Sequence, residues 1–187
     1  MTDDQKRARL RQLLEERSLK RGSFVLRSGK TSGYFLDGKQ TTLSAEGCAL
    51  VGELIFDLIR DLDLSAIGGP TLGADPIVAA VAAESWRRGR PLDAFIVRKE
   101  TKDHGLGDRI AGPVRVGQRV AIVEDVVTKG GAIGMAVDAA QEAGLAVVCA
   151  AAIIDRLEGG GDALRARGLD FRALFTIRDF GIEPPTD

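Results

Sequence analysis

The chain is 187 residues long, 44% of them hydrophobic and 28% charged, and its formal net charge is −1. This length suits a single domain over residues 1–187 with a sizeable core, and the near-zero net charge gives no indication of a nucleic-acid or membrane-surface partner. No apolar run approaches the ~18 residues that a membrane span needs, and the first residues lack the apolar core of a signal peptide, so we expect a soluble cytoplasmic protein.

The first predicted elements are one helix and two short strands. Residues 2–18 begin with a capping-box pattern and carry a narrow stripe of leucines, which predicts a surface helix that covers another part of the protein. Residues 23–26 and 34–37 have the composition of strands. The polar loop between them, residues 27–33, is either a simple hairpin turn or a segment that touches a ligand.

Helices and strands then alternate. Residues 46–59 repeat apolar side chains at spacings of three and four, so they predict a helix. A short strand over 65–68 leads through a glycine-rich turn, residues 69–73, into a helix with Asp75 at its cap and Pro76 in its first turn. That turn is either purely structural or a place where backbone N–H groups contact a phosphate.

Three residues with distinctive chemistry are assigned structural roles. Cys48 and Cys149 lie in apolar surroundings without metal-ligand spacing, so they are expected to be buried reduced thiols. Trp86, near the end of the helix that starts at Asp75, is expected to serve packing rather than ligand binding.

The composition changes abruptly after the strand predicted over 93–97. Residues 98–109 are polar and glycine-rich, which favours a mobile loop, and they include the basic side chains of Arg98, Lys99, Lys102, His104 and Arg109. A solvated charged loop is the ordinary interpretation. The cations outnumber the acids and the chain's one histidine lies among them, so a flexible flap that neutralises a polyanion is the alternative.

The most informative stretch is residues 119–132. An apolar, β-branched run over 120–123 predicts a buried parallel strand, and Glu124 and Asp125 follow where that strand is expected to end. A hydroxyl and a pair of glycines then lead into a helix expected over 132–143. Glycines and a helix N-terminus suit a phosphate, and carboxylates suit the vicinal hydroxyls of a ribose. The stretch therefore predicts a site for a phosphorylated ribose.

The C-terminal part repeats the same pattern. An apolar strand over 147–154 again ends in charge, at Asp155 and Arg156. Because parallel strands bring their C-terminal ends to one edge of a sheet, Arg156 is expected beside the same pocket. One helical turn over 162–167 and a final strand over 172–177 complete the predicted elements.

The alternation of strands and helices predicts an α/β fold with a central parallel sheet flanked by helices. Connections between parallel strands should be right-handed. We expect a core of about residues 44–155 and a small hood, formed by about residues 1–43 and 156–187, above the strand ends.

Residues 120–132 closely resemble the phosphoribosyl diphosphate (PRPP) signature of type I phosphoribosyltransferases: four apolar residues, two acidic residues and a loop of hydroxyl and glycine residues. Residues 24–37, residues 98–105 and Arg156 resemble orotate phosphoribosyltransferases in particular, and together the features cover residues 24–156 in matching order. The resemblance implies the type I phosphoribosyltransferase fold. It also implies transfer of ribose 5-phosphate from PRPP to N1 of orotate, which gives orotidine 5′-monophosphate and diphosphate in pyrimidine (UMP) biosynthesis.

The resemblance implies roles for individual residues. Those expected to bind PRPP are Arg98, Lys99, Lys102, His104, Glu124, Asp125, Val126, Val127, Thr128, Lys129, Gly130, Gly131 and Ala132. Those expected to bind orotate are Phe35, Leu36, Thr128 and Arg156, with Arg156 gripping the carboxylate. Those expected to be catalytic are Lys102, His104 and Asp125, with Lys102 making the key contact to the leaving diphosphate.

Cofactor and assembly are also implied. Mg²⁺ would be carried by PRPP rather than by protein ligands, and the enzyme would be a homodimer whose loop reaches the neighbouring subunit's site.

Two positions depart from the family pattern. Leu72 and Gly73 stand where several members carry Tyr-Lys, whose lysine reaches PRPP, and Arg27 stands where some members carry lysine.

Other functions fit these residues less well. A purine phosphoribosyltransferase would leave Arg156 without a carboxylate partner. A PRPP-sensing regulator that binds nucleic acid would need a basic face and an eroded cationic loop, whereas the loop cations are all present. A dinucleotide enzyme would need a G-x-G-x-x-G motif after the first core strand, and the sequence lacks one.

Overall fold

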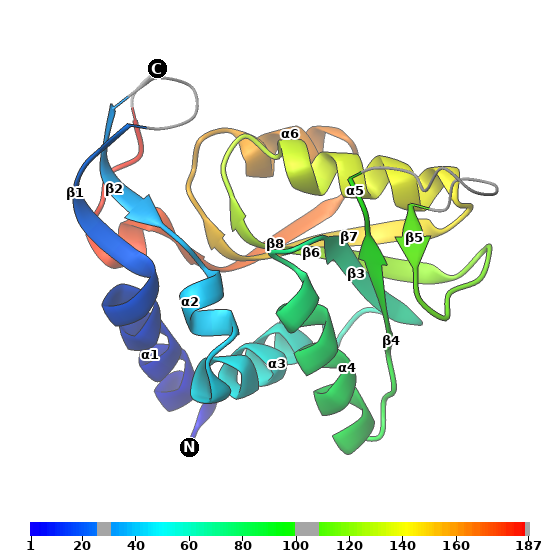
Figure 1. Ribbon diagram of the computed structural model, residues 1–187. Helices are drawn as coiled ribbons and strands as arrows, with labels where there is room; N and C mark the ends of the chain where they lie inside the picture. Colours follow the sequence, from blue (N-terminus) through cyan, green and yellow to red (C-terminus); the bar gives the residue numbers. More distant parts are fainter. Residues whose placement is uncertain (26–30, 100–108, 186–187) are drawn as a thin grey trace.

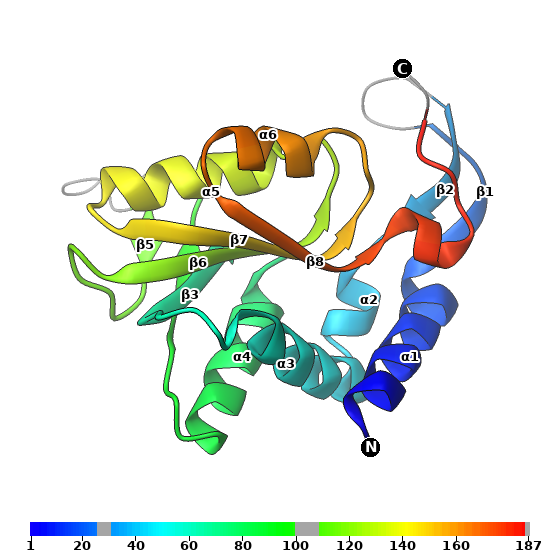
Figure 2. The ribbon, with the colours of Figure 1, turned by 180° about the vertical axis from the view of Figure 1, so that it is seen from behind.

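The computed structural model describes residues 1–25, 31–99 and 109–185. These residues form a six-stranded sheet with helices on both faces and a separate two-stranded hairpin (Figures 1 and 2). The helical segments are α1 (Asp3–Leu13), a π-helical turn (Leu14–Ser18), α2 (Lys39–Thr42), α3 (Ala45–Ile59), α4 (Asp75–Arg87), α5 (Gly131–Glu142), α6 (Gly160–Ala166) and a 3₁₀ turn (Ile177–Phe180). The strands are β1 (Leu19–Val25), β2 (Thr31–Leu36), β3 (Ala66–Pro70), β4 (Asp93–Val97), β5 (Ile110–Ala111), β6 (Arg119–Val127), β7 (Ala146–Asp155) and β8 (Asp170–Thr176). No helix within the described residues is both long and apolar enough to cross a membrane.

The main sheet has the strand order β5-β4-β3-β6-β7-β8. The five strands from β4 to β8 in this order pair in parallel, which confirms the predicted central parallel sheet. The edge strand β5 is antiparallel to β4, with Val97 opposite Ile110, and the sequence gives no sign of it.

The sheet separates two apolar clusters. In Figures 1 and 2, α1, α3 and α4 lie on one face of the sheet and α5 and α6 on the other. Along β6, Ala121 and Val123 join the cluster on the α3 side, whereas Val120 and Ile122 join the cluster on the α5 side. A strand that is buried on both faces needs an unbroken apolar run, which is why this segment could be predicted.

The hairpin of β1 and β2 contacts the last part of the chain. The guanidinium of Arg21 donates a hydrogen bond of 2.8 Å to the carbonyl of Phe180, and Phe180 is buried in the same cluster as Leu10 of α1. In both views the hairpin lies beside the C-terminal segment. The first and last segments of the chain therefore meet, but β8, which lies within the predicted hood of residues 156–187, belongs to the main sheet.

The first part of the chain largely follows the sequence prediction. Thr2 and Gln5 form the capping box at the start of α1, and Ser44 caps α3 by accepting a hydrogen bond from the backbone N–H of Gly47. The first strand begins earlier than predicted, at Leu19, because it continues directly from the π-helical turn. The single turn α2 is not predicted, since four residues are too few to show a helical period.

Several other local predictions need correction. The cap of α4 is Ala74, and Asp75 is the first helical residue. Trp86 is 76% exposed, so the packing role assigned to it is wrong for this chain alone. Cys149 is buried as predicted, whereas Cys48 is only partly buried, and both thiols are free.

Candidate active site

The two adjacent acids, Glu124 and Asp125, lie inside β6 rather than after its end. The strand continues to Val127 because β7 pairs with it as far as Asp155. Both acidic side chains are partly buried. The predicted end of the strand is therefore corrected, and the acids stand on regular backbone whose neighbours fix where they point.

Successive side chains of a strand point to opposite faces, so the two carboxylates diverge. Glu124 points toward α5, where its carboxylate accepts a hydrogen bond from the backbone N–H of Ile133. Asp125 points the other way, and a Cβ added at Gly38 would lie 2.6 Å from its Oδ2. A Cβ added at Gly73 would lie 2.7 Å from its Oδ1. Two glycines from distant segments therefore enclose the carboxylate of Asp125.

Burial dominates the electrostatics of the acidic pair. It raises the pKa of Glu124 from its ordinary value of 4.5 to about 7, and repulsion from Asp125 adds to this effect. The hydrogen bond from Ile133 and the charge of Lys99 oppose the rise. Burial also raises the pKa of Asp125, and here the charge of Lys39 is the main opposing effect. Each carboxylate is thus short of compensating positive charge and has one lysine near it.

The loop after β6 is tied to the loop after β7. The N–H of Arg156 donates to the carbonyl of Val127 at 2.9 Å, and the N–H of Gly160 donates to the carbonyl of Thr128 at 2.9 Å. A Cβ at Gly160 would lie 2.4 Å from the same Thr128 oxygen, so the two loops approach as closely as backbones can. Gly130 has a φ of +78°, which turns the chain into α5.

The start of α5 faces solvent. Gly131 and Ala132 are exposed at the first turn of the helix, and Lys129 is exposed just before it. First-turn N–H groups have no partner within their own helix, so this end can donate hydrogen bonds to an anion. Val126 is partly buried and Val127 fully buried, and the backbone of both pairs with β7.

Arg156 follows β7 and reaches the hairpin. Its Nε donates to the hydroxyl of Tyr34 at 2.8 Å, and its guanidinium lies 4.8 Å from the centre of that ring. Leu157 has a positive φ of 56°, and its N–H donates to the carboxylate of Asp155 at 2.9 Å. This turn brings Glu158 back to Arg156, with 2.7 Å between Oε1 and Nη2. The structure thus places Arg156 at the junction between the sheet and the hairpin.

Two predicted orotate residues sit on opposite faces of β2. Leu36 is partly buried and packs against the core cluster on the α3 side. Phe35 is 44% exposed, and its ring lies 5.9 Å from the ring of Phe24. Tyr34, which shares the face of Leu36, is the hairpin residue that meets Arg156. The sequence gives Tyr34 no separate role, because only the fold brings it to Arg156.

The structure describes both ends of the charged loop over residues 98–109, but not residues 100–108. The N–H of Arg98 donates to the carbonyl of Arg109 at 2.8 Å, so the two ends of the loop are held together beside β4 and β5. Lys99 is exposed, and its charge acts on Glu124. Lys102 and His104 lie outside the described residues, as does Arg27.

Lys39 and Asp37 belong to the site but were not identified from the sequence. The Nζ of Lys39 lies 2.6 Å from Oδ1 of Asp37, and Lys39 follows the glycine that touches Asp125. The hydrogen bond with Asp37 is the main cause that raises the pKa of Lys39, and the charges of Asp37 and Asp125 contribute as well. A lone lysine after a strand has no spacing signal, so nothing in the sequence would have singled it out.

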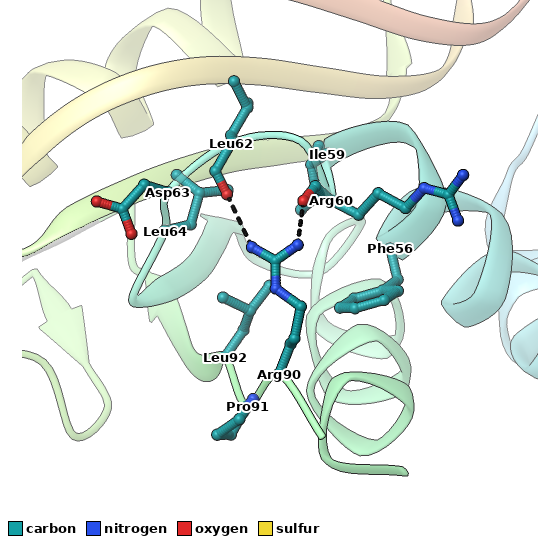
Figure 3. Close-up of a pocket in the computed structure, with 9 residues that line it drawn as sticks. All are labelled: Phe56, Ile59, Arg60, Leu62, Asp63, Leu64, Arg90, Pro91 and Leu92. Carbon is teal, nitrogen blue, oxygen red and sulfur yellow. Dashed lines mark hydrogen bonds between the residues drawn. The ribbon is translucent and has the colours of Figure 1, made fainter. Parts of the chain in front are cut away.

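A pocket lies at the opposite edge of the sheet, where β3 and β4 begin (Figure 3). Its lining includes Phe56, Ile59 and Leu92, and the guanidinium of Arg90 crosses it. Arg90 donates to the carbonyls of Leu62, at 3.4 Å, and of Arg60. Arg90, which lies just before β4, therefore ties its own segment to the segment that precedes β3. This pocket is remote from the acidic pair.

Comparison with known proteins gives a consistent result. A protein of Rhodopirellula baltica named orotate phosphoribosyltransferase is 44% identical over 178 residues, which are 92% of this chain and 92% of that protein. One of Sorangium cellulosum with the same name is 48% identical over 180 residues, or 93% and 92% of the two chains. No protein-family profile matches the chain.

The fold has solved counterparts as well. The crystal structure of Mycobacterium tuberculosis orotate phosphoribosyltransferase in complex with PRPP superimposes with a TM-score of 0.82. The two sequences are 39% identical, and the match covers 95% of this chain and 99% of the other. Similarity therefore extends over essentially the whole of both chains, including the segments that carry the acidic pair and Arg156.

The raised pKa of Glu124 predicts a pH-dependent stability. Above its ordinary pKa of 4.5 the unfolded chain releases this proton while the folded chain keeps it until about pH 7. The free energy of unfolding therefore loses a contribution as the pH rises through this window, and the loss is complete above it. Replacing Glu124 by glutamine removes the loss.

We expect Glu124→Gln to stabilise the ligand-free protein more at about pH 8 than at about pH 5. Urea unfolding of both proteins at the two pH values measures this difference, and the effects of groups that do not interact with Glu124 cancel between them. An equal difference at both pH values would contradict the burial argument.

Proposed function

This chain belongs to the orotate phosphoribosyltransferase family, and we propose that it transfers the ribose 5-phosphate unit of PRPP to N1 of orotate. The products are orotidine 5′-monophosphate and diphosphate, and the reaction is a step of pyrimidine biosynthesis. The observation that carries this proposal is identity of 44% and 48% to two orotate phosphoribosyltransferases over more than nine tenths of the chain.

Transfer of this kind passes through a ribosyl group with oxocarbenium character, so the protein has no need of its own nucleophile. It must hold the sugar in place, stabilise the charge that develops on the diphosphate, and exclude water that would otherwise capture the ribosyl cation. The divided arrangement of the site, with acids on β6, an anion-binding helix start and Arg156 beyond it, suits these three tasks.

The acidic pair and the loop after it suit the ribose and its phosphate. We propose that Glu124 and Asp125 accept hydrogen bonds from the ribose 2′- and 3′-hydroxyls, since both are fixed by β6. The segment from Val126 to Ala132 would cradle the 5′-phosphate, because it ends in the exposed start of α5. The side chain of Thr128 would lie between this phosphate and the acceptor.

The same acids fit a cation. Their pKa values are raised by burial, so their charged forms gain from a nearby positive charge, and carboxylate oxygens are ligands that suit Mg²⁺. We propose that Mg²⁺ arrives bound to the oxygens of PRPP. When bound, it would neutralise part of the negative charge on the leaving diphosphate.

The loop that starts at Arg98 would act on the diphosphate. Arg98 and Lys99 stand at its base, close enough for Lys99 to act on Glu124. We propose that these two residues, together with Lys102 and His104, bind the diphosphate and stabilise its charge. Lys102 would contribute most in the transition state, as the resemblance implies. A location in the cytoplasm is part of the same proposal.

The nucleobase specificity is the first test. With PRPP and Mg²⁺ present, we expect rapid consumption of orotate and little or no consumption of adenine or hypoxanthine, because Arg156 pairs with a carboxylate that purines lack. A spectrophotometric assay of the three acceptors measures this. Preference for a purine would overturn the proposal, and PRPP binding without any turnover would support a PRPP-sensing regulator instead.

Replacing Arg156 tests the acceptor end directly. Arg156→Ala should raise the KM for orotate by about tenfold or more, because a charge-assisted pair is lost, and should change the KM for PRPP little. Arg165→Ala, which removes an exposed arginine of α6, is the matched control. An unchanged KM for orotate would refute the role of Arg156.

Assembly is the third test. We propose a homodimer in which the loop of one subunit completes the site of the other. Lys102→Ala and Asp125→Ala chains, each inactive alone, should then regain about a quarter of the wild-type activity when mixed as dimers, because half the dimers are mixed and each has one intact site. If each loop served its own subunit, every site would keep one defect and no activity would return.

A further inference from the structure

The Asp125 side of the site contains a lysine that the family resemblance does not assign. Lys39 begins α2, a single turn between the β1–β2 hairpin and α3 (Figure 1). The residue before it, Gly38, is buried against the carboxylate of Asp125. The start of α2 is therefore fixed at the acidic pair by a contact that leaves no space between the two segments.

Asp37 holds the ammonium of Lys39 in place. Its Oδ1 lies 2.6 Å from the Nζ of Lys39 and also accepts the backbone N–H of Lys39 at 3.3 Å. Its Oδ2 accepts a hydrogen bond from the side chain of Gln40 at 3.2 Å. Burial acts to raise the pKa of Asp37, but these hydrogen bonds and the charge of Lys39 lower it overall. Asp37 is therefore a charged partner that orients the lysine.

Lys39 also remains accessible. Its side chain is 41% exposed. Because an ammonium carries three N–H donors, Lys39 can donate to a ligand while it keeps its contact with Asp37. Its charge acts on Asp125, as the effects on the pKa values of both residues show. Lys39 directly follows Gly38, which contacts Asp125, so its charge lies on the Asp125 side of the acidic pair.

The site needs such a cation at this point. PRPP brings a diphosphate close to the ribose hydroxyls, and an acid next to those hydroxyls would repel it. Lys99 acts on the Glu124 side, but the turn beside Asp125 offers only Leu72 and Gly73. A Cβ at position 73 would lie 2.7 Å from Oδ1 of Asp125, so Gly73 lets this turn approach the carboxylate closely but supplies no charge. The positive charge on this side must therefore come from another segment.

We propose that Lys39 binds the diphosphate of PRPP on the Asp125 side of the site, with Asp37 as the residue that positions it. This inference rests on the proposed function, because it assumes that PRPP occupies the site. It supplies, from the segment after β2, the cation that the turn at Leu72 and Gly73 lacks. One lysine then serves each acid, Lys99 for Glu124 and Lys39 for Asp125.

The test compares two fragments of PRPP as probes. Binding of inorganic diphosphate with Mg²⁺, and of ribose 5-phosphate, is measured by calorimetry for the wild type, Lys39→Met and Lys39→Arg. Lys39→Met should weaken diphosphate binding by about tenfold or more and leave ribose 5-phosphate binding unchanged, because only the diphosphate contacts the ammonium. Lys39→Arg should recover most of the affinity, since it keeps the charge.

The control is Lys20→Met, which makes the same change at an exposed lysine of β1 and should alter neither affinity. Lys39→Gln, measured in parallel, covers the case in which the methionine variant folds poorly. Equal weakening of both probes, or weakening of ribose 5-phosphate alone, would overturn the proposal, because Lys39 would then act through Asp125 on the sugar. Unchanged diphosphate binding would overturn it as well.

Kinetics separate this inference from the proposed function. In the orotate assay, Lys39→Met should raise the KM for PRPP and leave the KM for orotate unchanged. The calorimetric comparison needs no orotate, so it decides the role of Lys39 even if orotate proves not to be the acceptor. Failure of the orotate assay with the wild-type protein would instead count against the proposed function alone.

Discussion

The site depends on the enclosure of Asp125 between two glycines. Gly38 comes from the segment after the hairpin and Gly73 from the turn after β3, and a Cβ at either position would meet the carboxylate within 2.7 Å. Asp125 itself is set by the pairing of β6 with β7, which continues past the acids to Val127. Three segments that are remote in the chain therefore converge on one side chain. The packing of these segments therefore fixes the position of the Asp125 carboxylate.

This enclosure has an electrostatic consequence. Removing Glu124 and Asp125 from water raises the pKa of both, and backbone hydrogen bonds and one nearby lysine charge for each acid oppose this only in part. The ligand-free site is therefore held in an unfavourable state. A ligand that places a positive charge beside the acids would favour their charged forms, so its binding would also stabilise the fold.

Arg156 is held in place by its neighbours. A guanidinium has five N–H donors in a fixed plane, and here Nε faces Tyr34 while Nη2 faces Glu158. These partners orient the group before any ligand arrives, which lowers the entropic cost of binding. They also explain the location of the hairpin, because the hydroxyl of Tyr34 ties it to the turn after β7.

The same geometry explains what could be predicted from the sequence. The main strands and helices were predictable because burial on one or both faces imposes a period, and the acidic pair was predictable because it directly follows an apolar run. The length of β6 was not, since its last residues are held in the strand by β7 rather than by their own composition. Trp86 was misjudged because an apolar residue at a helix end can face solvent as well as core. Lys39 was overlooked for a deeper reason: its role follows from the contact of Gly38 with Asp125, which exists only after the chain has folded. Lys39 owes its position near Asp125 to the packing of the neighbouring Gly38, and no sequence pattern marks such a residue. Residues of this kind become recognisable only from the packing around a charged group in the folded protein.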